Sequence, residues 1–146
     1  MNAAIAGVSG SLAQGLLMFV KRWLDILPGF QPYSMMQQRL GEMTGDLMTP
    51  YLIPLLGFVN GALVLSYLFG KLYDKIPSEH GLMKGMLFGT FGWLLFNLSL
   101  FPMLGYGFFV SNLHLGALPS IFSFVMIQSY SLVLAFAYAK LMHRNL

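Results

Sequence analysis

Cysteine is absent from the 146 residues of this chain, and charged residues are scarce. Without a thiol the chain has no disulfide, no thiolate metal site and no cysteine nucleophile. Charged residues make up 9% of the sequence and hydrophobic residues 57%, whereas soluble domains carry about 25% charged residues. This balance is typical of an integral membrane protein. The net charge of +3 comes from a few residues near the ends of apolar runs, so it predicts orientation in a bilayer and no nucleic-acid partner.

Ionisable residues are also missing from the interior of the long apolar runs. Proton relays and ion-coupled carriers usually place such a group inside the membrane, so a pump or a coupled transporter is not expected. The histidines His80, His114 and His143 are scattered outside the runs and do not supply the four clustered ligands of a structural zinc site. No nucleophile, acid and base are grouped in the sequence. We therefore predict neither an enzyme nor a metal site.

Four apolar runs are present instead, at residues 3–20, 51–70, 85–104 and 118–139. About 20 residues at 1.5 Å rise cross a hydrocarbon core of about 30 Å. The first run is followed, not preceded, by its positive charges, which favours a retained span over a secretory signal. The sequence thus predicts an all-α, polytopic protein in which residues 1–146 form one membrane domain, a bundle of four transmembrane helices.

A segment of mixed polarity separates the first two runs. Ser34 and Gln37 have the spacing of a capping box, which predicts a short helix over about residues 34–44. Apolar side chains recur there at helical spacing, at Met36, Leu40 and Met43. That periodicity favours a helix lying in the membrane interface over a plain connecting loop.

The cations predict the orientation of the bundle. An even number of spans places both termini on one side, and five cations fall on that side: Lys71, Lys75, Lys84, Lys140 and Arg144. Three cations fall on the other side, where three acids accompany them: Lys21, Arg22 and Arg39. Because cytoplasmic loops carry the excess of Lys and Arg, we predict that both termini are cytoplasmic.

Small residues four apart mark the faces on which these helices are expected to pack. Glycines at this spacing let two backbones approach closely, which is a main source of helix association in lipid. The expected packing residues are Gly7, Ser11 and Gly15 in the first span, Gly57 and Gly61 in the second, and Gly81, Gly85 and Gly89 at the third. The stretch from Gly81 to Gly105 is the richest in glycine, and we expect the third span to be the hub of the bundle.

Each span also carries one amide near its middle: Gln14, Asn60, Asn97 and Gln128. An unpaired amide in hydrocarbon costs several kcal/mol, so all four are expected to face inward at a similar depth. We favour a structural layer that fixes helix rotation. The alternative is a site for a polar headgroup, a quinone carbonyl or a pigment metal.

Trp93 lies well inside the third span, away from the interfaces where tryptophan is enriched. Together with neighbouring phenylalanines it predicts ordinary packing or, alternatively, a surface for a carotenoid or pigment tail. The turn after this span contains Gly105, Tyr106 and Gly107. This tripeptide occurs in potassium-channel filters, but the preceding residues differ and no pore helix precedes it. A glycine-rich turn is therefore favoured.

The third run reads GLMKGMLFGTFGWLL and is followed by a proline and GYGFF. In these features residues 51–139 resemble small uncharacterised four-span bacterial inner-membrane proteins of unknown function. The resemblance implies a four-helix fold and a bacterial inner membrane, and it transfers no activity and no catalytic residue.

These observations together predict a non-catalytic accessory or structural subunit of a larger membrane complex, of a respiratory or photosynthetic kind. Its expected partners are the lipid bilayer and other membrane subunits. No cofactor is predicted by a motif. The alternative is a membrane protein that binds a lipid, carotenoid, pigment or quinone, or a passive transporter, through the amides and Trp93.

Overall fold

A computed structural model of the protein describes residues 2–45 and 51–143. The described residues form helices and no strand. The elements, in chain order, are α1 Asn2–Trp23, α2 Pro32–Thr44, α3 Leu52–Val59, η1 Asn60–Leu65, α4 Ser66–Leu72, α5 Gly81–Leu95, η2 Phe96–Leu100, α6 Phe101–Met103, η3 Phe108–Leu113 and α7 Leu118–Leu141. The predicted all-α fold is confirmed.

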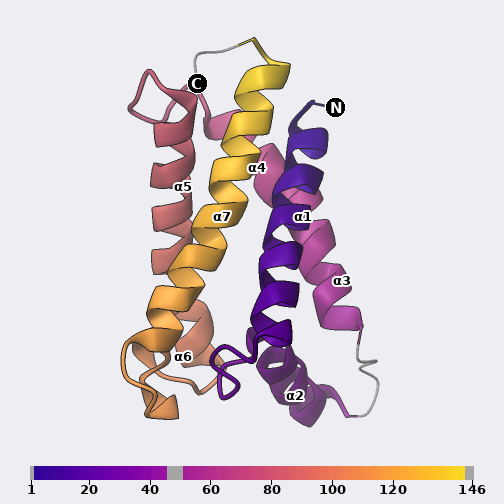
Figure 1. Ribbon diagram of the computed structural model, residues 1–146, viewed down its shortest axis with the longest axis vertical. Helices are drawn as coiled ribbons and strands as arrows, with labels where there is room; N and C mark the ends of the chain where they lie inside the picture. Colours follow the sequence, from indigo (N-terminus) through magenta and orange to yellow (C-terminus); the bar gives the residue numbers. More distant parts are fainter. Residues whose placement is uncertain (1, 46–50, 144–146) are drawn as a thin grey trace.

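Four continuous helical stretches are long and apolar enough to cross a membrane: Asn2–Trp23, Leu52–Leu72, Gly81–Met103 and Leu118–Leu141. They run side by side and alternate in direction (Figure 1). Both ends of the described chain lie at one end of the bundle, where the Asn2 amide donates a hydrogen bond to Met142 Sδ at 3.4 Å. The arrangement is consistent with an integral membrane protein.

The second and third stretches each contain a π-helical segment, Asn60–Leu65 and Phe96–Leu100. In the third stretch the wide turn immediately precedes Pro102. Proline has no N–H and its ring displaces the carbonyl four residues earlier, so the helix widens there. In the second stretch Ser66 Oγ donates to the carbonyls of Ala62 and Leu63, at 2.6 and 3.2 Å. Such side-chain bonds to the preceding turn often bend a helix.

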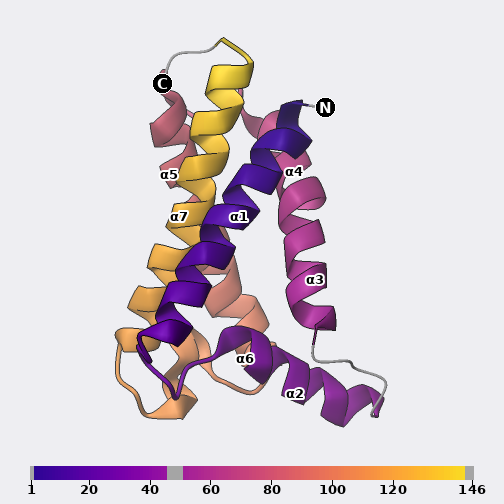
Figure 2. The same cartoon turned by 45° about the vertical axis from the view of Figure 1, so that its right-hand side comes forward.

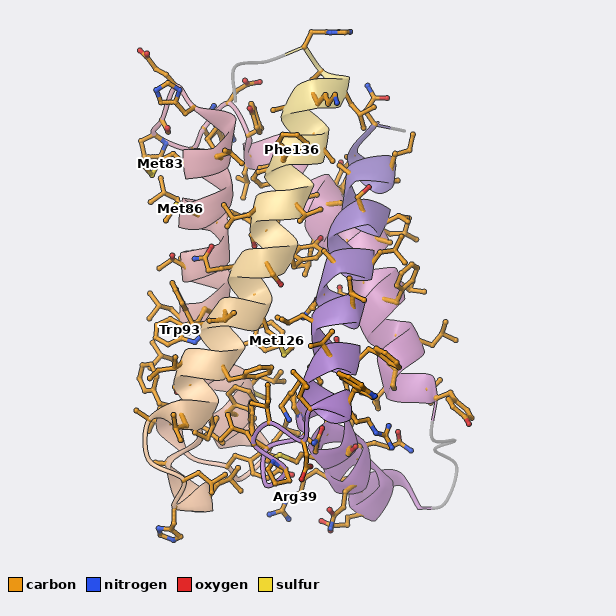
Figure 3. All side chains as sticks on the ribbon, in the orientation of Figure 1. Arg39, Met83, Met86, Trp93, Met126 and Phe136 are labelled. Atoms are coloured by element: carbon orange, nitrogen blue, oxygen red, sulfur yellow. The ribbon has the colours of Figure 1, made fainter. Side chains whose placement is uncertain are left out.

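The central helix is α7, which lies between α1 and α5 (Figure 1). It buries ten residues, whereas α5 buries four. The expectation that the third span is the hub is therefore wrong. Glycines four apart make a single helix face, and α5 uses that face for one neighbour, α7. Its opposite side is open: Met83 and Met86 project away from α7 and are 48% and 45% exposed (Figure 3).

The short helix α2 runs beneath α3 at an angle to the four long stretches (Figure 2). It begins at Pro32 and not at Ser34, and Gln31 precedes it without a side-chain cap. The predicted capping box is therefore not formed. Proline at the first helical position needs no capping partner for its missing N–H and fixes a helical φ, which explains the earlier start.

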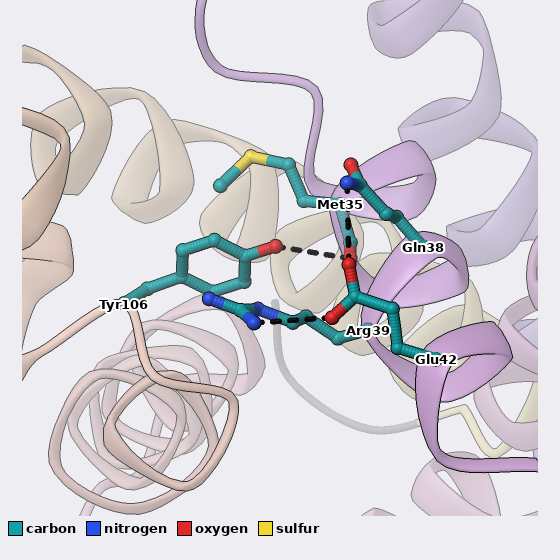
Figure 4. A network of polar contacts seen from close by, with 5 residues as sticks. All are labelled: Met35, Gln38, Arg39, Glu42 and Tyr106. Carbon is teal, nitrogen blue, oxygen red and sulfur yellow. Dashed lines mark hydrogen bonds and ion pairs between the residues drawn. The ribbon is translucent and has the colours of Figure 1, made fainter.

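The turn at Gly105–Gly107 attaches α2 to the bundle. Gly105 and Gly107 have φ of 82° and 75°, which glycine adopts without strain. Tyr106 between them is buried and donates a hydrogen bond from its hydroxyl to the Met35 carbonyl at 3.0 Å (Figure 4). Arg39 lies over the Tyr106 ring, 5.6 Å from its centroid. The tripeptide thus serves as a turn that anchors a neighbouring helix.

The topology can be tested with single cysteines, since the chain has none of its own. Glu79 is exposed in the link between α4 and α5, and Leu115 is exposed in the link before α7, at the opposite end of the bundle. We expect a membrane-impermeant maleimide to label Glu79→Cys and Leu115→Cys from opposite sides of the membrane in cells. Labelling of both from one side would contradict the four-span topology.

Candidate functional site

The four mid-span amides do not form a common layer. Asn97 is fully buried and Gln128 is buried, whereas Gln14 is half-buried and Asn60 is exposed. The expectation that all four face inward is wrong for Asn60. The face of this span against α1 is taken by small residues, among them Gly61, and the next residue along a helix points about 100° away.

Asn97 is the centre of a hydrogen-bond network between the third span and α7. Its Nδ2 donates to the Trp93 carbonyl at 2.9 Å, and its Oδ1 accepts from Ser120 Oγ at 3.1 Å. Trp93 Nε1 in turn donates to the Ser120 carbonyl and to Ser123 Oγ, both at 3.1 Å. Trp93 and Asn97, two separate candidates in the sequence, thus belong to one network. Every polar side-chain atom of these two residues has a partner inside the protein.

A cavity of about 550 Å³ lies on the outer side of this network. Its walls include the rings of Trp93, Phe109 and Phe124. The centroid of the Trp93 ring lies 5.5 Å from that of Phe109 and 5.2 Å from that of Phe124. Asn97 does not line it. The cavity therefore suits an apolar chain, such as a lipid tail, and offers no amide to a quinone carbonyl or a pigment metal.

Gln128 links α7 to α5 at a second level. Its Nε2 donates to Thr90 Oγ1 at 2.8 Å and to the Met86 carbonyl at 3.2 Å. Its Oε1 is buried and has no hydrogen-bond partner among the described residues. A Cβ added at Gly89 would lie 2.8 Å from that oxygen, so this glycine leaves the room that the amide occupies. Neither Gln128 nor Asn97 contacts another of the four amides by a hydrogen bond.

Close helix contacts occur at several of the small residues expected to pack. A Cβ at Gly7 would lie 2.6 Å from the Ala62 carbonyl oxygen, and one at Gly61 would lie 2.5 Å from Ser11 Oγ. Gly85 faces α7 in the same way, 2.7 Å from the Ser131 carbonyl oxygen. Backbone and side-chain atoms at these distances leave no room for a larger residue.

The remaining small residues differ in their surroundings. Gly81 is buried at the start of α5. Gly57 faces the ring of Tyr33 on α2, with an added Cβ at 3.2 Å, rather than another long helix. Gly15 has no atom within 4 Å of such a Cβ. Its spacing from Ser11 predicts a packing face, but no neighbouring helix closely approaches α1 at Gly15 among the described residues.

Two buried lysines and the serines of α7 were not foreseen from the sequence. Lys21 is 1% exposed and donates to the Leu27 carbonyl at 3.0 Å, and Lys84 donates to the Tyr73 carbonyl at 2.6 Å. Nothing in their sequence context distinguishes them from ordinary cations at helix ends. The spacing of Ser131 and Ala135, four apart, did mark the face of α7 toward α5, and a search for small residues beyond glycine would have found it. The described part of the chain holds no cluster of three residues that could bind a metal ion.

The glycine contacts predict a difference between two leucine substitutions. In Gly85→Leu the new side chain would meet the Ser131 carbonyl and the Ala135 methyl group. We expect the free energy of unfolding to fall by about 1–3 kcal/mol, the usual cost of overpacking. Gly15→Leu meets open space and should leave the stability unchanged or higher. Unfolding in detergent would measure both, and equal stability of the two variants would contradict the packing argument.

A separate substitution tests the role of Asn97. Asn97→Leu removes the hydrogen bond with Ser120, whose hydroxyl keeps a second acceptor, the Phe109 carbonyl at 3.0 Å. Because no buried donor is left unpaired, we expect a loss of only about 1 kcal/mol. The same unfolding experiment measures it. A folded Asn97→Leu protein that has lost a bound quinone, pigment or lipid would show a binding role instead.

Comparison with known proteins places the chain in a family without assigning an activity. The model of the family of unknown function DUF6789 matches residues 1–145. No curated protein and no solved structure matches the chain. The expected resemblance to proteins of unknown function is confirmed to that extent, and a bacterial origin stays a prediction. With nearly the whole chain matched, the protein belongs to the family of unknown function DUF6789.

Proposed function

We propose that the protein is a non-catalytic accessory subunit that packs laterally against another membrane protein through the outer face of α3, η1 and α4. The observation that supports this most directly is Asn60. Its side chain is exposed, lies near the middle of the Leu52–Leu72 stretch, and makes no hydrogen bond within the described residues.

An amide at that depth is unfavourable against lipid. Transfer of an unpaired amide into hydrocarbon costs several kcal/mol, and no water is available at mid-membrane to satisfy it. A polar group on a neighbouring protein helix would supply the missing partner. Amide side chains commonly form hydrogen bonds between helices in membranes.

The face around Asn60 suits such a contact. Leu56, Leu63 and Tyr67 lie four residues before, three after and seven after Asn60, and are 50%, 55% and 66% exposed. These three exposed side chains are apolar or aromatic, so the amide is surrounded by surface that a partner helix can cover. Within the described chain this stretch packs mainly against α1, so its outer face is open to a partner.

The competing functions have weaker support. A passive transporter would need a continuous polar path, but Asn97 is bonded inside one helix pair and Asn60 lies outside the bundle. An enzyme would need a group that reacts, and the buried lysines are each bonded to a backbone carbonyl. The apolar cavity beside Trp93 is compatible with a lipid tail, which an accessory subunit can also hold.

We further propose an orientation with both termini on the cytoplasmic side of a bacterial inner membrane. The end of the bundle that holds the termini carries Lys71, Lys75, Lys84 and Lys140. The other end carries Lys21, Arg22 and Arg39, of which Arg39 pairs with Glu42 at 3.1 Å. The uneven distribution favours this orientation. The respiratory or photosynthetic nature of the parent complex stays a prediction.

Site-specific photo-crosslinking tests the lateral contact. A photoreactive residue at Leu63 in the native host should give a protein adduct, whereas one at Leu87, which is 41% exposed on α5, should not. Asn60→Leu should abolish the adduct because it removes the polar bond. Asn97→Leu, the same substitution at a buried amide, should preserve it.

Two results would contradict the proposal. The first is a Leu63 adduct that survives Asn60→Leu, since the amide would then have no role in the contact. The second is an adduct formed only with another copy of the chain, which would indicate a homo-oligomer and no accessory role.

A further inference from the structure

A second cavity, of about 920 Å³, lies where α1 ends, α2 crosses and α3 begins. In Figure 1 the lower end of α1, α2 and the start of α3 lie toward the lower right of the view, whereas α5 and α7 lie to the left. The last turns of α1 contribute Met18, Phe19 and Arg22, and α2 contributes a polar face that includes Ser34 and Gln37. The polar face of α2 is therefore turned toward a cavity of the protein.

The charge in this cavity is unbalanced. The side chain of Arg22 is exposed and makes no hydrogen bond or ion pair among residues 2–45 and 51–143. Among the described residues, Glu42 supplies the one carboxylate that lines the cavity, and it accepts bonds from Arg39 at 3.1 Å and from Gln38 at 3.4 Å (Figure 4). The hydrogen bond and charge of Glu42 raise the pKa of Arg39, so the guanidinium of Arg39 stays ionised. Among the described lining residues, one positive charge, on Arg22, is thus left for a ligand.

Neutral donors surround this cation. Gln31, Gln37 and Tyr33 line the cavity and are each half-buried. Burial raises the pKa of the Tyr33 phenol, so its hydroxyl stays protonated well above neutral pH. Amides and a protonated phenol can each donate a hydrogen bond to an oxygen atom. An arginine with amide and hydroxyl donors is a favourable setting for a phosphate group.

The depth of Arg22 agrees with a lipid phosphate. The 22 residues of α1 span about 33 Å, so its ends reach the headgroup regions on both sides of a hydrocarbon core of about 30 Å. Arg22 lies in the last turn, and Met18 and Phe19 lie one turn deeper. A cation at headgroup depth thus has an apolar wall leading into the hydrocarbon.

The two adjacent cations Lys21 and Arg22 have opposite surroundings: Lys21 is buried in the protein, whereas Arg22 is exposed. Lys21 turns inward, where it is 1% exposed, donates to the Leu27 carbonyl and lies 5.4 Å from the centre of the Phe122 ring. The ammonium group of Lys21 is therefore occupied by contacts within the protein. Of the two adjacent cations, Arg22 alone lines the cavity.

We propose that this cavity binds an anionic phospholipid, with the phosphate against Arg22 and the acyl chains along Met18 and Phe19. A zwitterionic headgroup also carries a positive charge, which would need a carboxylate partner. Glu42, the carboxylate among the described lining residues, is already paired with Arg39. The proposal rests on the geometry of α1, α2 and α3 and is independent of the lateral partner proposed above.

Native mass spectrometry of the full chain in detergent, titrated with phosphatidylglycerol, phosphatidylcholine or inorganic phosphate, tests the proposal. The wild-type chain should bind phosphatidylglycerol most tightly. Arg22→Gln should weaken that binding about tenfold or more, since a charged hydrogen bond is lost. Lys71→Gln removes an exposed cation from the last turn of α4, at the other end of the bundle, and should leave the binding unchanged.

A second variant tests the cavity without changing charge. Gly41 lines the cavity, and a Cβ added there has no atom within 4 Å. Gly41→Leu should therefore fold, as thermal unfolding without lipid would verify, and should reduce lipid binding by filling the space. Equal binding of phosphatidylcholine, or unchanged binding in both Arg22→Gln and Gly41→Leu, would overturn the proposal. Inorganic phosphate that binds as tightly as the lipid would identify a free anion as the ligand and would also overturn it.

Discussion

The close approach of α7 to both α1 and α5 is the contact on which the rest of the bundle depends. On one side a Cβ at Gly10 would lie 2.9 Å from the Tyr130 carbonyl oxygen, and on the other a Cβ at Gly85 would lie 2.7 Å from that of Ser131. Lipid tails are as apolar as the side chains, so helices associate in a membrane through such close packing and through hydrogen bonds. The flanking helices are therefore joined through α7, and the second span is joined to the bundle mainly through α1.

The polar groups divide the molecule into two unlike halves. Between the third span and α7, Asn97, Trp93 and Ser120 bond to one another and leave an apolar surface. On the side of α1, α2 and α3, Asn60 and Arg22 instead point outward, one at mid-span and one at a span end. A polar side chain that the fold leaves unpaired is costly in a membrane. The side whose unpaired polar groups are exposed is thus where external partners, protein or lipid, are best accommodated.

The sequence-based predictions succeeded or failed according to the geometry they required. A span needs only length and apolarity, because the bilayer forces each backbone polar group to bond within its own helix. The tendency of amides to avoid lipid predicts an inward-facing Asn60. That tendency holds on average over many positions and does not fix the direction of one side chain. Its actual direction follows from Gly61 and its neighbours, which face α1. Glycine spacing alone predicts a hub in the third span, whereas Ser131 and Ala135 show that small residues other than glycine form the packing face of α7.

The sequence by itself determined the four apolar helices, the short helix between the first two, and the lack of charge within the predicted apolar runs. These features follow from composition and local periodicity, which each segment carries alone. Only the tertiary structure decided that α7 is central, that Trp93 and Asn97 share a network, and that Asn60 and Arg22 face outward. These features depend on the rotation of each helix about its axis. That rotation is set by contacts between segments distant in sequence, which no single segment encodes.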